Sequence, residues 1–343
     1  MKTLLLTVLV CFTLCLTTRA QTPRPTIGQI IRADPRLDKL IPKEAKIEVL
    51  ASGFTWAEGP IWVKDGGYLL FSDVPQNTIF KWSEKDGLST FLKPSGYTGA
   101  GNYSDEPGSN GLTLDGQGRL VLCEHGDRRV SVMPLNGGGK RTLADNFEGK
   151  RFNSPNDVVV SNGIYYFTDP PYGLAKKEND PTRETPLFGV YRATLAENGK
   201  PARISLLIDD LTRPNGIAFS PDRDGGPERT LYIAQSDPAR PVIMAYPMQP
   251  DGSVGKGRVF FDAMPLMKQK LPGLPDGLKT DRDGNVWSTG PGGVLVIAPD
   301  GTLLGRIDTG QATANCGWGD DGRTLYITAD GYLCRVKTTA RGW

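Results

Sequence analysis

The sequence has almost no net charge and a single histidine. Lys and Arg total 40 against 38 Asp and Glu in 343 residues, so no broad basic field exists to hold a phosphate backbone, and a nucleic-acid partner is excluded. With His125 as the only histidine, a multi-histidine zinc or copper site cannot be built. A Gly-x-Ser-x-Gly motif is also absent, and His125 follows Glu124 rather than serving a visible serine. Covalent catalysis by a Ser-His-Asp triad is therefore disfavoured.

Long apolar runs are equally scarce. The one candidate, Leu4 to Leu16, lies in an N-terminal segment that is typical of a secretory signal peptide over residues 1–20, with cleavage between Ala20 and Gln21. An uncleaved membrane anchor is the alternative, although the run is shorter than the roughly 20 residues that a span requires. Cleavage removes two basic residues and leaves 38 of each sign. We expect a secreted or periplasmic protein with no membrane association after cleavage, either a monomer or a weak dimer.

Cysteine is too rare for a disulfide framework. Two of the five cysteines leave with the signal peptide, and Cys123, Cys316 and Cys334 remain. An odd number in an oxidising compartment leaves at least one thiol unpaired. A bridge between Cys316 and Cys334 is possible, but the two fall on strands that are not neighbours in a hairpin order. We expect three buried thiols.

Glycine and proline, by contrast, are abundant, at 42 and 27 residues without a collagen period, which indicates many tight turns between short strands. Six times a polar residue leads a short apolar strand, which runs through a Gly-containing turn into a second strand rich in aromatic and β-branched residues. The six leading residues are Glu58, Asn110, Asn156, Asn215, Asp276 and Asn315.

These repeats predict an all-β fold. Successive leading residues lie 39 to 61 residues apart, near the period of roughly 40 to 50 residues of a four-stranded propeller blade. We therefore expect residues 46–343 to form a single six-bladed β-propeller with a central channel, preceded by an extended arm over residues 21–45. The segment 46–50 (KIEVL) can supply the outer strand of the last blade and close the ring. A sandwich of two open sheets is the alternative.

In a propeller the first strand of each blade lines the axis, so the six leading side chains converge on one mouth of the channel. They offer two carboxylates and four amides, an oxygen set that suits Ca²⁺, with Mg²⁺, Mn²⁺ and Zn²⁺ as alternatives. Taken singly, an Asn or Asp before Gly is more often an ordinary turn residue. Here a polar residue recurs at the same position of all six repeats, and the first of them is a glutamate, which is not a typical turn residue. Together these features favour a metal site at the mouth of the channel.

Six segments of the chain closely resemble the gluconolactonase branch of the senescence-marker-protein (regucalcin) and gluconolactonase family. The resemblance covers nearly the whole chain from about residue 46, with the motifs in the family's order. The segments are WAEGPIW (56–62), CEHGDRRV (123–130), RFNSPNDVVV (151–160), TDPPYGL (168–174), RPNGIAFS (213–220) and PDGLKTD (275–281).

The resemblance implies a propeller hydrolase with one catalytic divalent metal at the channel mouth. The matching ligand positions are Glu58, Asn156, Asn215 and Asp276, whereas Asn110 and Asn315 belong to the pocket wall or an inner layer. Further candidates for contacting substrate were chosen from the motifs and the loops, and each has a purely structural alternative, such as a solvated loop cation or a satisfied core histidine. These candidates are Asn110, Arg151, Asn153, His125 and Tyr172.

The expected function is hydrolysis of a small sugar lactone. The metal would polarise the lactone carbonyl, and a carboxylate would take a proton from the attacking water. Asp276 is the first choice of base and Glu58 the second. The polar loops 94–109 and 172–187 suit a hydroxylated substrate. The alternatives are a calcium-dependent phosphotriesterase, and a propeller that binds sugar or calcium without catalysis.

Overall fold

The computed structural model describes residues 23–195, 202–221 and 230–343. The predicted signal peptide, residues 1–20, and its cleavage site lie outside these residues. Within the described ranges no helix has the length and apolar character needed to cross a membrane.

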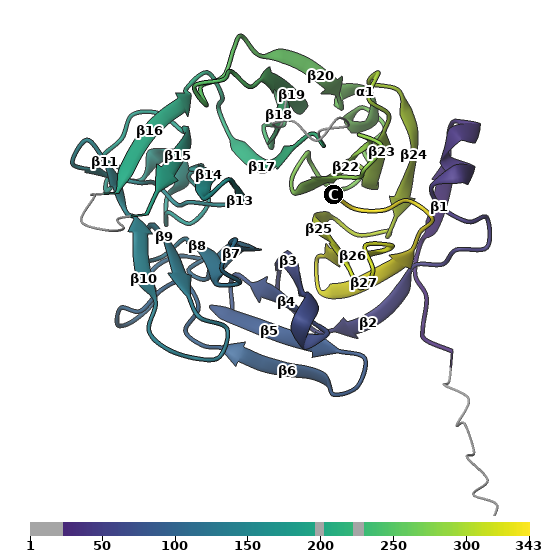
Figure 1. The fold of residues 1–343 in the computed structure, drawn as a ribbon, viewed down its shortest axis with the longest axis horizontal. Coiled ribbons are helices and arrows are strands. Elements are labelled where there is room, and N and C mark those ends of the chain that lie inside the picture. Colours follow the sequence, from purple (N-terminus) through teal and green to yellow (C-terminus); the bar gives the residue numbers. More distant parts are fainter. Residues whose placement is uncertain (1–22, 196–201, 222–229) are drawn as a thin grey trace, which may run out of the picture.

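Six antiparallel sheets, each of four strands or more, surround a central axis (Figure 1). We number these blades in chain order and give their strands from the axis outwards. Blade 1 contains β3 (Ala57–Val63), β4 (Tyr68–Asp73), β5 (Thr78–Ser83) and β6 (Gly87–Leu92). Blade 2 contains β7 (Ser109–Leu114), β8 (Leu120–Glu124), β9 (Arg129–Met133) and β10 (Arg141–Ala144). Blade 3 contains β13 (Val158–Ser161), β14 (Ile164–Thr168), β15 (Val190–Thr194) and β16 (Arg203–Ile208).

The second half of the ring follows the same plan. Blade 4 contains β17 (Pro214–Phe219), β18 (Thr230–Gln235), β19 (Val242–Pro247) and β20 (Arg258–Asp262). Blade 5 contains β21 (Leu278–Thr280), β22 (Val286–Gly290), β23 (Gly293–Ile297), β24 (Leu303–Asp308) and β1 (Gln29–Arg32). Blade 6 contains β25 (Thr313–Gly319), β26 (Thr324–Ala329), β27 (Tyr332–Lys337) and β2 (Glu48–Ser52). The predicted six-bladed propeller is confirmed, and the sandwich alternative is wrong.

The ring closes on itself at blade 6. Each innermost strand contacts the innermost strands of both neighbouring blades, including β25 against β3, where the last blade meets the first. The closing strand is β2, which pairs antiparallel with β27, Glu48 opposite Arg335. An ion pair between the same two side chains, at 2.7 Å, accompanies this pairing. The outer strand of the last blade therefore comes from the predicted part of the chain, although it begins two residues later than the segment 46–50 and ends at Ser52.

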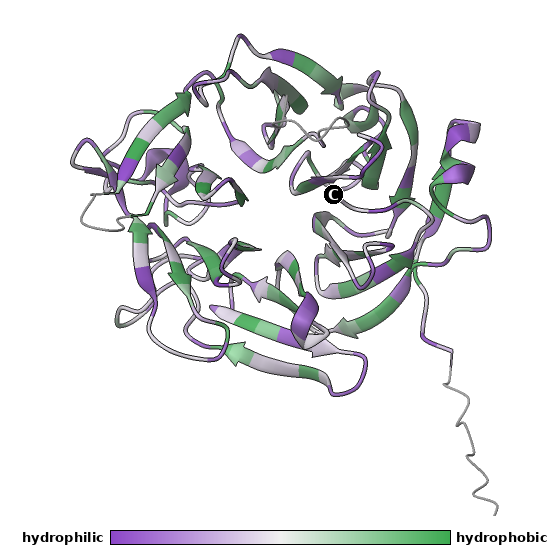
Figure 2. Ribbon diagram, in the orientation of Figure 1, coloured by the Kyte–Doolittle hydropathy of each residue, from purple (hydrophilic) through white to green (hydrophobic). Residues whose placement is uncertain are grey.

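The hydrophobic core lies between the blades rather than along the axis. In β4, Leu69 and Phe71 pack towards blade 6 while Leu70, between them, packs towards blade 2, as the alternation of side chains along a strand requires. Both faces of a blade are thus buried against a neighbour, and Figure 2 shows hydrophobic residues along the strands of every blade. This arrangement leaves the polar leading residues free to face the channel.

The N-terminal segment is more ordered than the predicted extended arm. Strand β1 adds a fifth strand to blade 5 by pairing with β24, Gln29 opposite Asp308. A 3₁₀ helix, η1 (Pro35–Lys39), follows, and its N-cap Asp34 accepts a hydrogen bond from the Arg36 backbone N–H at 2.8 Å. Leu37 in this helix, and Leu40 and Ile41 directly after it, are buried in the core of blades 5 and 6. The free edge of β24 and this burial order the segment.

Where the structure describes the connections between blade strands, the elements in them are short. These are η2 (Lys64–Gly66), the hairpin β11 (Asn146–Phe147) and β12 (Lys150–Arg151), η3 (Lys177–Asn179) and α1 (Met264–Met267).

The three cysteines Cys123, Cys316 and Cys334 are free and buried, so the expected thiols are confirmed and the Cys316–Cys334 bridge is wrong. The two residues of that pair lie on β25 and β27, which are separated by β26. Burial raises the pKa of Cys316 and of Cys334 to about 12.

The three thiols should resist modification in the native protein, because they are both inaccessible and protonated. We expect iodoacetamide to leave all three unmodified under native conditions and to modify all three in guanidinium chloride. Mass spectrometry of the peptides that contain these cysteines measures the outcome. Native labelling of any of the three would show that its blade interface opens readily.

Candidate functional site

Five of the six leading residues face one cavity at the end of the channel. Glu58, Asn110 and Asn215 lie on the innermost strands β3, β7 and β17, whereas Asn156 and Asp276 lie just before β13 and β21. The cavity has a volume of about 360 Å³. Its remaining lining residues are Trp56, Glu106, Tyr172, Lys177, Arg213, Ser236, Gly273 and Leu274.

The sixth leading residue, Asn315, lies behind the cavity and supports Glu58. Its Nδ2 donates a hydrogen bond to Glu58 Oε2 at 3.2 Å, and the Gly59 N–H donates to the same oxygen at 3.1 Å. Asn315 Oδ1 accepts from the Cys316 N–H at 2.9 Å. One oxygen of Glu58 is therefore held by two donors, while Oε1 accepts no hydrogen bond from the described residues and remains available to a ligand.

Hydroxyl groups on the second strand of one blade hold the main chain at the next leading residue. Ser72 of β4 donates to the Asn110 carbonyl and Thr168 of β14 to the Asn215 carbonyl, each at 2.8 Å. Ser236, directly after β18, donates in the same way to the carbonyl of Pro275, next to Asp276. Blades 1, 3 and 4 thus fix the backbone from which the following blade presents a side chain to the cavity.

Two aspartates repeat a second supporting contact. Asp73, at the end of β4, accepts from the N–H groups of Thr55 and Trp56, at 2.9 and 3.3 Å. Asp169, directly after β14, accepts from the N–H groups of Asn153 and Ser154, each at 2.8 Å. In both blades the bonded N–H groups lie three and two residues before a leading residue, Glu58 or Asn156. The carboxylates therefore fix the approach of the chain to the cavity.

The amides of Asn156 and Asn215 are oriented by hydrogen-bond acceptors. The Ser236 hydroxyl donates its hydrogen bond to the Pro275 carbonyl. Its oxygen therefore accepts the hydrogen bond from Asn215 Nδ2, at 3.1 Å. His125 Nδ1 lies 3.3 Å from the Glu106 carbonyl, so Nδ1 carries the proton, and Nε2 accepts from Asn156 Nδ2 at 3.5 Å. Because each NH₂ group is engaged on the far side, each amide oxygen is directed to the cavity.

Buried oxygens without partners collect at this site. Asn110 Oδ1, Asn215 Oδ1 and Asp276 Oδ1 are buried and accept no hydrogen bond from the described residues. Unsatisfied buried oxygens of this kind require an explanation, such as an ion or a water molecule. Three oxygens lining one cavity are suited to a hard cation, which coordinates carboxylate and amide oxygens.

The carboxylates of Glu58 and Asp276 give a second reason to expect a cation at the cavity. Burial, and then the charge of Asp157, raises the pKa of Glu58 to about 8. Burial, and then the charge of Glu58, raises the pKa of Asp276 well above its usual range. Within the described part of the chain neither carboxylate forms an ion pair, and no three His, Cys, Asp or Glu side chains gather as a metal-binding group. A cation here would be held by two carboxylates and by amides.

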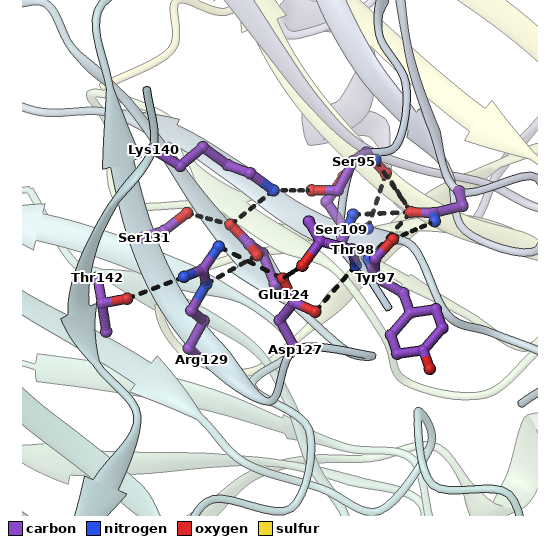
Figure 3. A network of polar contacts seen from close by, with 12 residues as sticks. Ser95, Tyr97, Thr98, Ser109, Glu124, Asp127, Arg129, Ser131, Lys140 and Thr142 are labelled. Atoms are coloured by element: carbon purple, nitrogen blue, oxygen red, sulfur yellow. Dashed lines mark hydrogen bonds and ion pairs between the residues drawn. The ribbon is translucent and has the colours of Figure 1, made fainter. Parts of the chain in front are cut away.

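The loop 94–109 brings a further carboxylate, Glu106, to the cavity. Its first residues are fixed by Asn77, whose Oδ1 accepts from the N–H groups of Ser95, Gly96 and Tyr97 at 2.8 to 3.2 Å. Figure 3 shows the adjoining network, in which Lys140 donates to the Ser95 carbonyl and pairs with the buried Glu124 at 3.1 Å. The loop is thereby attached to blade 2 on the side away from the cavity.

The loop 172–187 contributes Tyr172 and Lys177 from the other side. The Tyr172 hydroxyl donates to the Ser236 carbonyl at 3.4 Å. Glu178, next to Lys177, forms an ion pair with Arg213 at 2.6 Å, which links this loop to the residue two positions before Asn215. Both loops that the sequence singles out therefore line the cavity.

Three of the proposed substrate contacts lie elsewhere. Arg151 is exposed on β12, where its Nη2 donates to the Asp127 carbonyl at 3.2 Å. Asn153 is buried, and its Nδ2 donates to Asp169 and to the Leu187 carbonyl, each at 3.0 Å. His125 is fully buried behind Asn156. None of the three is among the residues that line the cavity, and their roles in substrate binding stay predictions.

Several contributors were not foreseen from the sequence. Glu106 and Lys177 follow no repeat, and only their loops are indicated by the sequence. Ser236 lies at the end of the fourth repeat, as Ser72 and Thr168 lie at the ends of the first and third, but the sequence alone does not show its contact with Pro275. For Asp73 and Asp169 a signal existed, because FSD and FTD end the second strand in two of the repeats. Comparing these strand ends would have suggested a shared supporting role.

Comparison with known proteins gives consistent matches. The model of the SMP-30/Gluconolactonase/LRE-like region matches residues 56–331. A gluconolactonase of Zymomonas mobilis is 41% identical over 92% of this chain and 88% of its own length. The pentonolactonase XacC of Haloferax volcanii is 32% identical over 80% and 81%. The solved structure of XC5397, a gluconolactonase from Xanthomonas campestris, has a TM-score of 0.76 at 30% identity, covering 94% of this chain and 99% of that one.

Asp169 should be essential to the segment that presents Asn156. In Asp169→Asn an NH₂ group replaces one oxygen and faces N–H donors, so we expect a loss of about 1–3 kcal/mol in the free energy of unfolding. Urea denaturation measures this loss, with Asp209→Asn, an exposed position after β16 of the same blade, as the matched control. Equal stability of the two variants would contradict the supporting role of Asp169.

Proposed function

The chain belongs to the SMP-30/gluconolactonase/LRE-like family, whose model covers residues 56–331, and on this basis we propose that it is a lactonase that opens a sugar lactone with the help of a divalent cation. Two relatives that match four fifths or more of the chain bear the names gluconolactonase and pentonolactonase. The observation that carries the proposal is the set of unpartnered oxygens and unpaired carboxylates around one cavity.

The proposed cation ligands are Glu58, Asn156, Asn215 and Asp276. Each presents an oxygen at the cavity, and the contacts of His125 and Ser236 direct the two amide oxygens there. An all-oxygen set with two carboxylates favours Ca²⁺, with Mg²⁺, Mn²⁺ and Zn²⁺ as alternatives in that order. Asn110 Oδ1 lines the same cavity and is placed to contact the substrate or a water molecule.

The charge around the cavity supports an uncharged substrate. Three carboxylates line it, and the positive Lys177 and Arg213 face them, with Arg213 already paired to Glu178. A divalent cation would balance the charges of the two proposed ligands, Glu58 and Asp276. A neutral sugar lactone, whose hydroxyls can pair with amide and hydroxyl groups of the wall, fits such a site.

In the proposed reaction the chain's own residues move protons and hold the lactone. The bound cation supplies a Lewis acid for the carbonyl oxygen. Asp276 can use one oxygen as a ligand and the other to accept a proton from the attacking water, and Glu58 is the second candidate for this role. The tetrahedral adduct then collapses with opening of the ring.

We also propose that the protein acts outside the cytoplasm, since residues 1–20 have the pattern of a signal peptide. We propose in addition that the protein is a monomer or a weak dimer.

The first test is hydrolysis of glucono-1,5-lactone, followed with a pH indicator and corrected for the spontaneous rate. We expect turnover that EDTA abolishes and Ca²⁺ restores. Mg²⁺, Mn²⁺ and Zn²⁺ are tried in parallel after EDTA treatment. A folded protein that leaves sugar lactones unchanged in every metal would contradict the lactonase proposal and favour a binding propeller. Activity that is insensitive to EDTA would contradict the role of the cation.

Asp276→Asn tests the proposed base. The amide keeps an oxygen for the cation but cannot accept a proton, so we expect kcat to fall by roughly 10²–10⁴-fold. Ca²⁺ affinity, measured by calorimetry, shows whether the cation is still bound. Asp65→Asn, at an exposed position of blade 1, is the control. Unchanged kcat in Asp276→Asn would remove this residue from the role of base.

A further inference from the structure

Glu106 is a carboxylate at the cavity that lies on a loop between two blades, and not on or directly before an innermost strand. Glu58 and Asp276 are presented by the innermost layer of blades 1 and 5, whereas Glu106 lies on the loop between blades 1 and 2. Its side chain is 28% exposed, so solvent protons can reach it. Glu106 therefore faces the same space as the proposed ligands from a different element, and it retains access to water.

The groups around Glu106 do not neutralise it. His125 Nδ1 lies 3.8 Å from Glu106 Oε2, but burial lowers the pKa of His125 to about 4, so the imidazole is uncharged at neutral pH. Lys177 on the opposite loop lowers the pKa of Glu106, while the neighbouring Asp105 raises it. The more distant Glu58 and Asp276 add negative charge on the side of the cavity. Burial dominates and raises the pKa of Glu106 to about 7.

The position of Glu106 is fixed at several points of its loop. Besides the bonds from Asn77, the Ser109 N–H donates to Ser95 Oγ at 3.0 Å, which joins the two ends of the loop. Thr98 donates to Asp127 through its N–H and its hydroxyl, at 3.0 and 2.9 Å. The Glu106 carbonyl faces His125, which in turn bonds Asn156. The backbone that carries Glu106 is therefore fixed beside the cavity, and a group positioned in this way can act on a bound substrate.

We propose that Glu106 is the general acid of the ring-opening step and delivers its proton to the ring oxygen as the acyl carbon–oxygen bond breaks. This inference rests on the proposed lactonase function. It assigns different roles to two carboxylates in different environments: Asp276, held as a cation ligand, works ionised, and Glu106, away from the ligands, works protonated.

The protons balance over one turnover. Asp276 accepts a proton from water while the water oxygen bonds to the carbonyl carbon, and the bond between this carbon and the ring oxygen then breaks. The ring oxygen leaves as a hydroxyl with the proton of Glu106. Asp276 returns its proton to solvent, and Glu106 takes one from solvent through its exposed edge. The acid product ionises on release, so the net reaction consumes one water and liberates one proton.

The test compares the pH dependence of glucono-1,5-lactone hydrolysis by wild type and Glu106→Gln between pH 5 and 8.5, at saturating Ca²⁺ and corrected for spontaneous hydrolysis. A general acid is active while protonated, so wild-type kcat should fall as pH rises through about 7. Glutamine cannot donate this proton, and we expect kcat to be lower by roughly 10²-fold or more at pH 6 and the decline above pH 7 to disappear. Asp65→Asn, at an exposed position of blade 1 outside the residues that line the cavity, should keep the wild-type profile.

Calorimetry with Ca²⁺ and thermal denaturation of Glu106→Gln accompany the kinetics, and both should match wild type. A decline near pH 7 that persists in Glu106→Gln, or a kcat close to that of wild type, would overturn the proposal. A loss of Ca²⁺ affinity that accounts for the lost rate would also overturn it, since Glu106 would then be a cation ligand. If the wild-type protein itself does not hydrolyse lactones, that result contradicts the lactonase proposal, on which the role of Glu106 rests.

Discussion

Closure of the ring is the constraint on which the cavity depends. The residues that face it lie between Trp56 and Asp276 in sequence, and Asn315 behind Glu58 comes from the last blade. Only when β2 pairs with β27 and β25 meets β3 do these residues surround one space. The closed ring also brings carboxylates together in a buried place, where their mutual repulsion creates the demand for a cation.

The supporting contacts explain how side chains on separate sheets reach a common geometry. Ser72, Thr168 and Ser236 each bond the main chain of the following blade. The position of one leading residue is thus set by its neighbour, and an error in the packing of a blade would be passed to the next. His125 belongs to the same layer, because it orients Asn156 and is fully buried.

Much of the fold and part of the site could be predicted because both repeat. The period of the strands indicates the blades, and the polar residue before each first strand indicates what faces the channel. Asn315 shares that phase but lies behind Glu58, since its amide is used on Oε2. Glu106 and Lys177 could not be found in this way, because their places depend on tertiary anchors such as Asn77 and on the Glu178–Arg213 pair. Strand β1 was missed because four residues between turns carry too weak a local signal.

The N-terminal strands have a consequence for the order of folding. Strands β1 and β2 leave the ribosome first, yet their partners β24 and β27 belong to the last two blades and follow more than 250 residues later. Such pairings of distant segments form slowly, because the entropy of a very long loop must be lost before any contact is gained. Until synthesis is complete, the apolar residues Leu37 and Ile41 have no core to enter. The order of synthesis thus leaves β1 and β2 without their strand partners until blades 5 and 6 have been made.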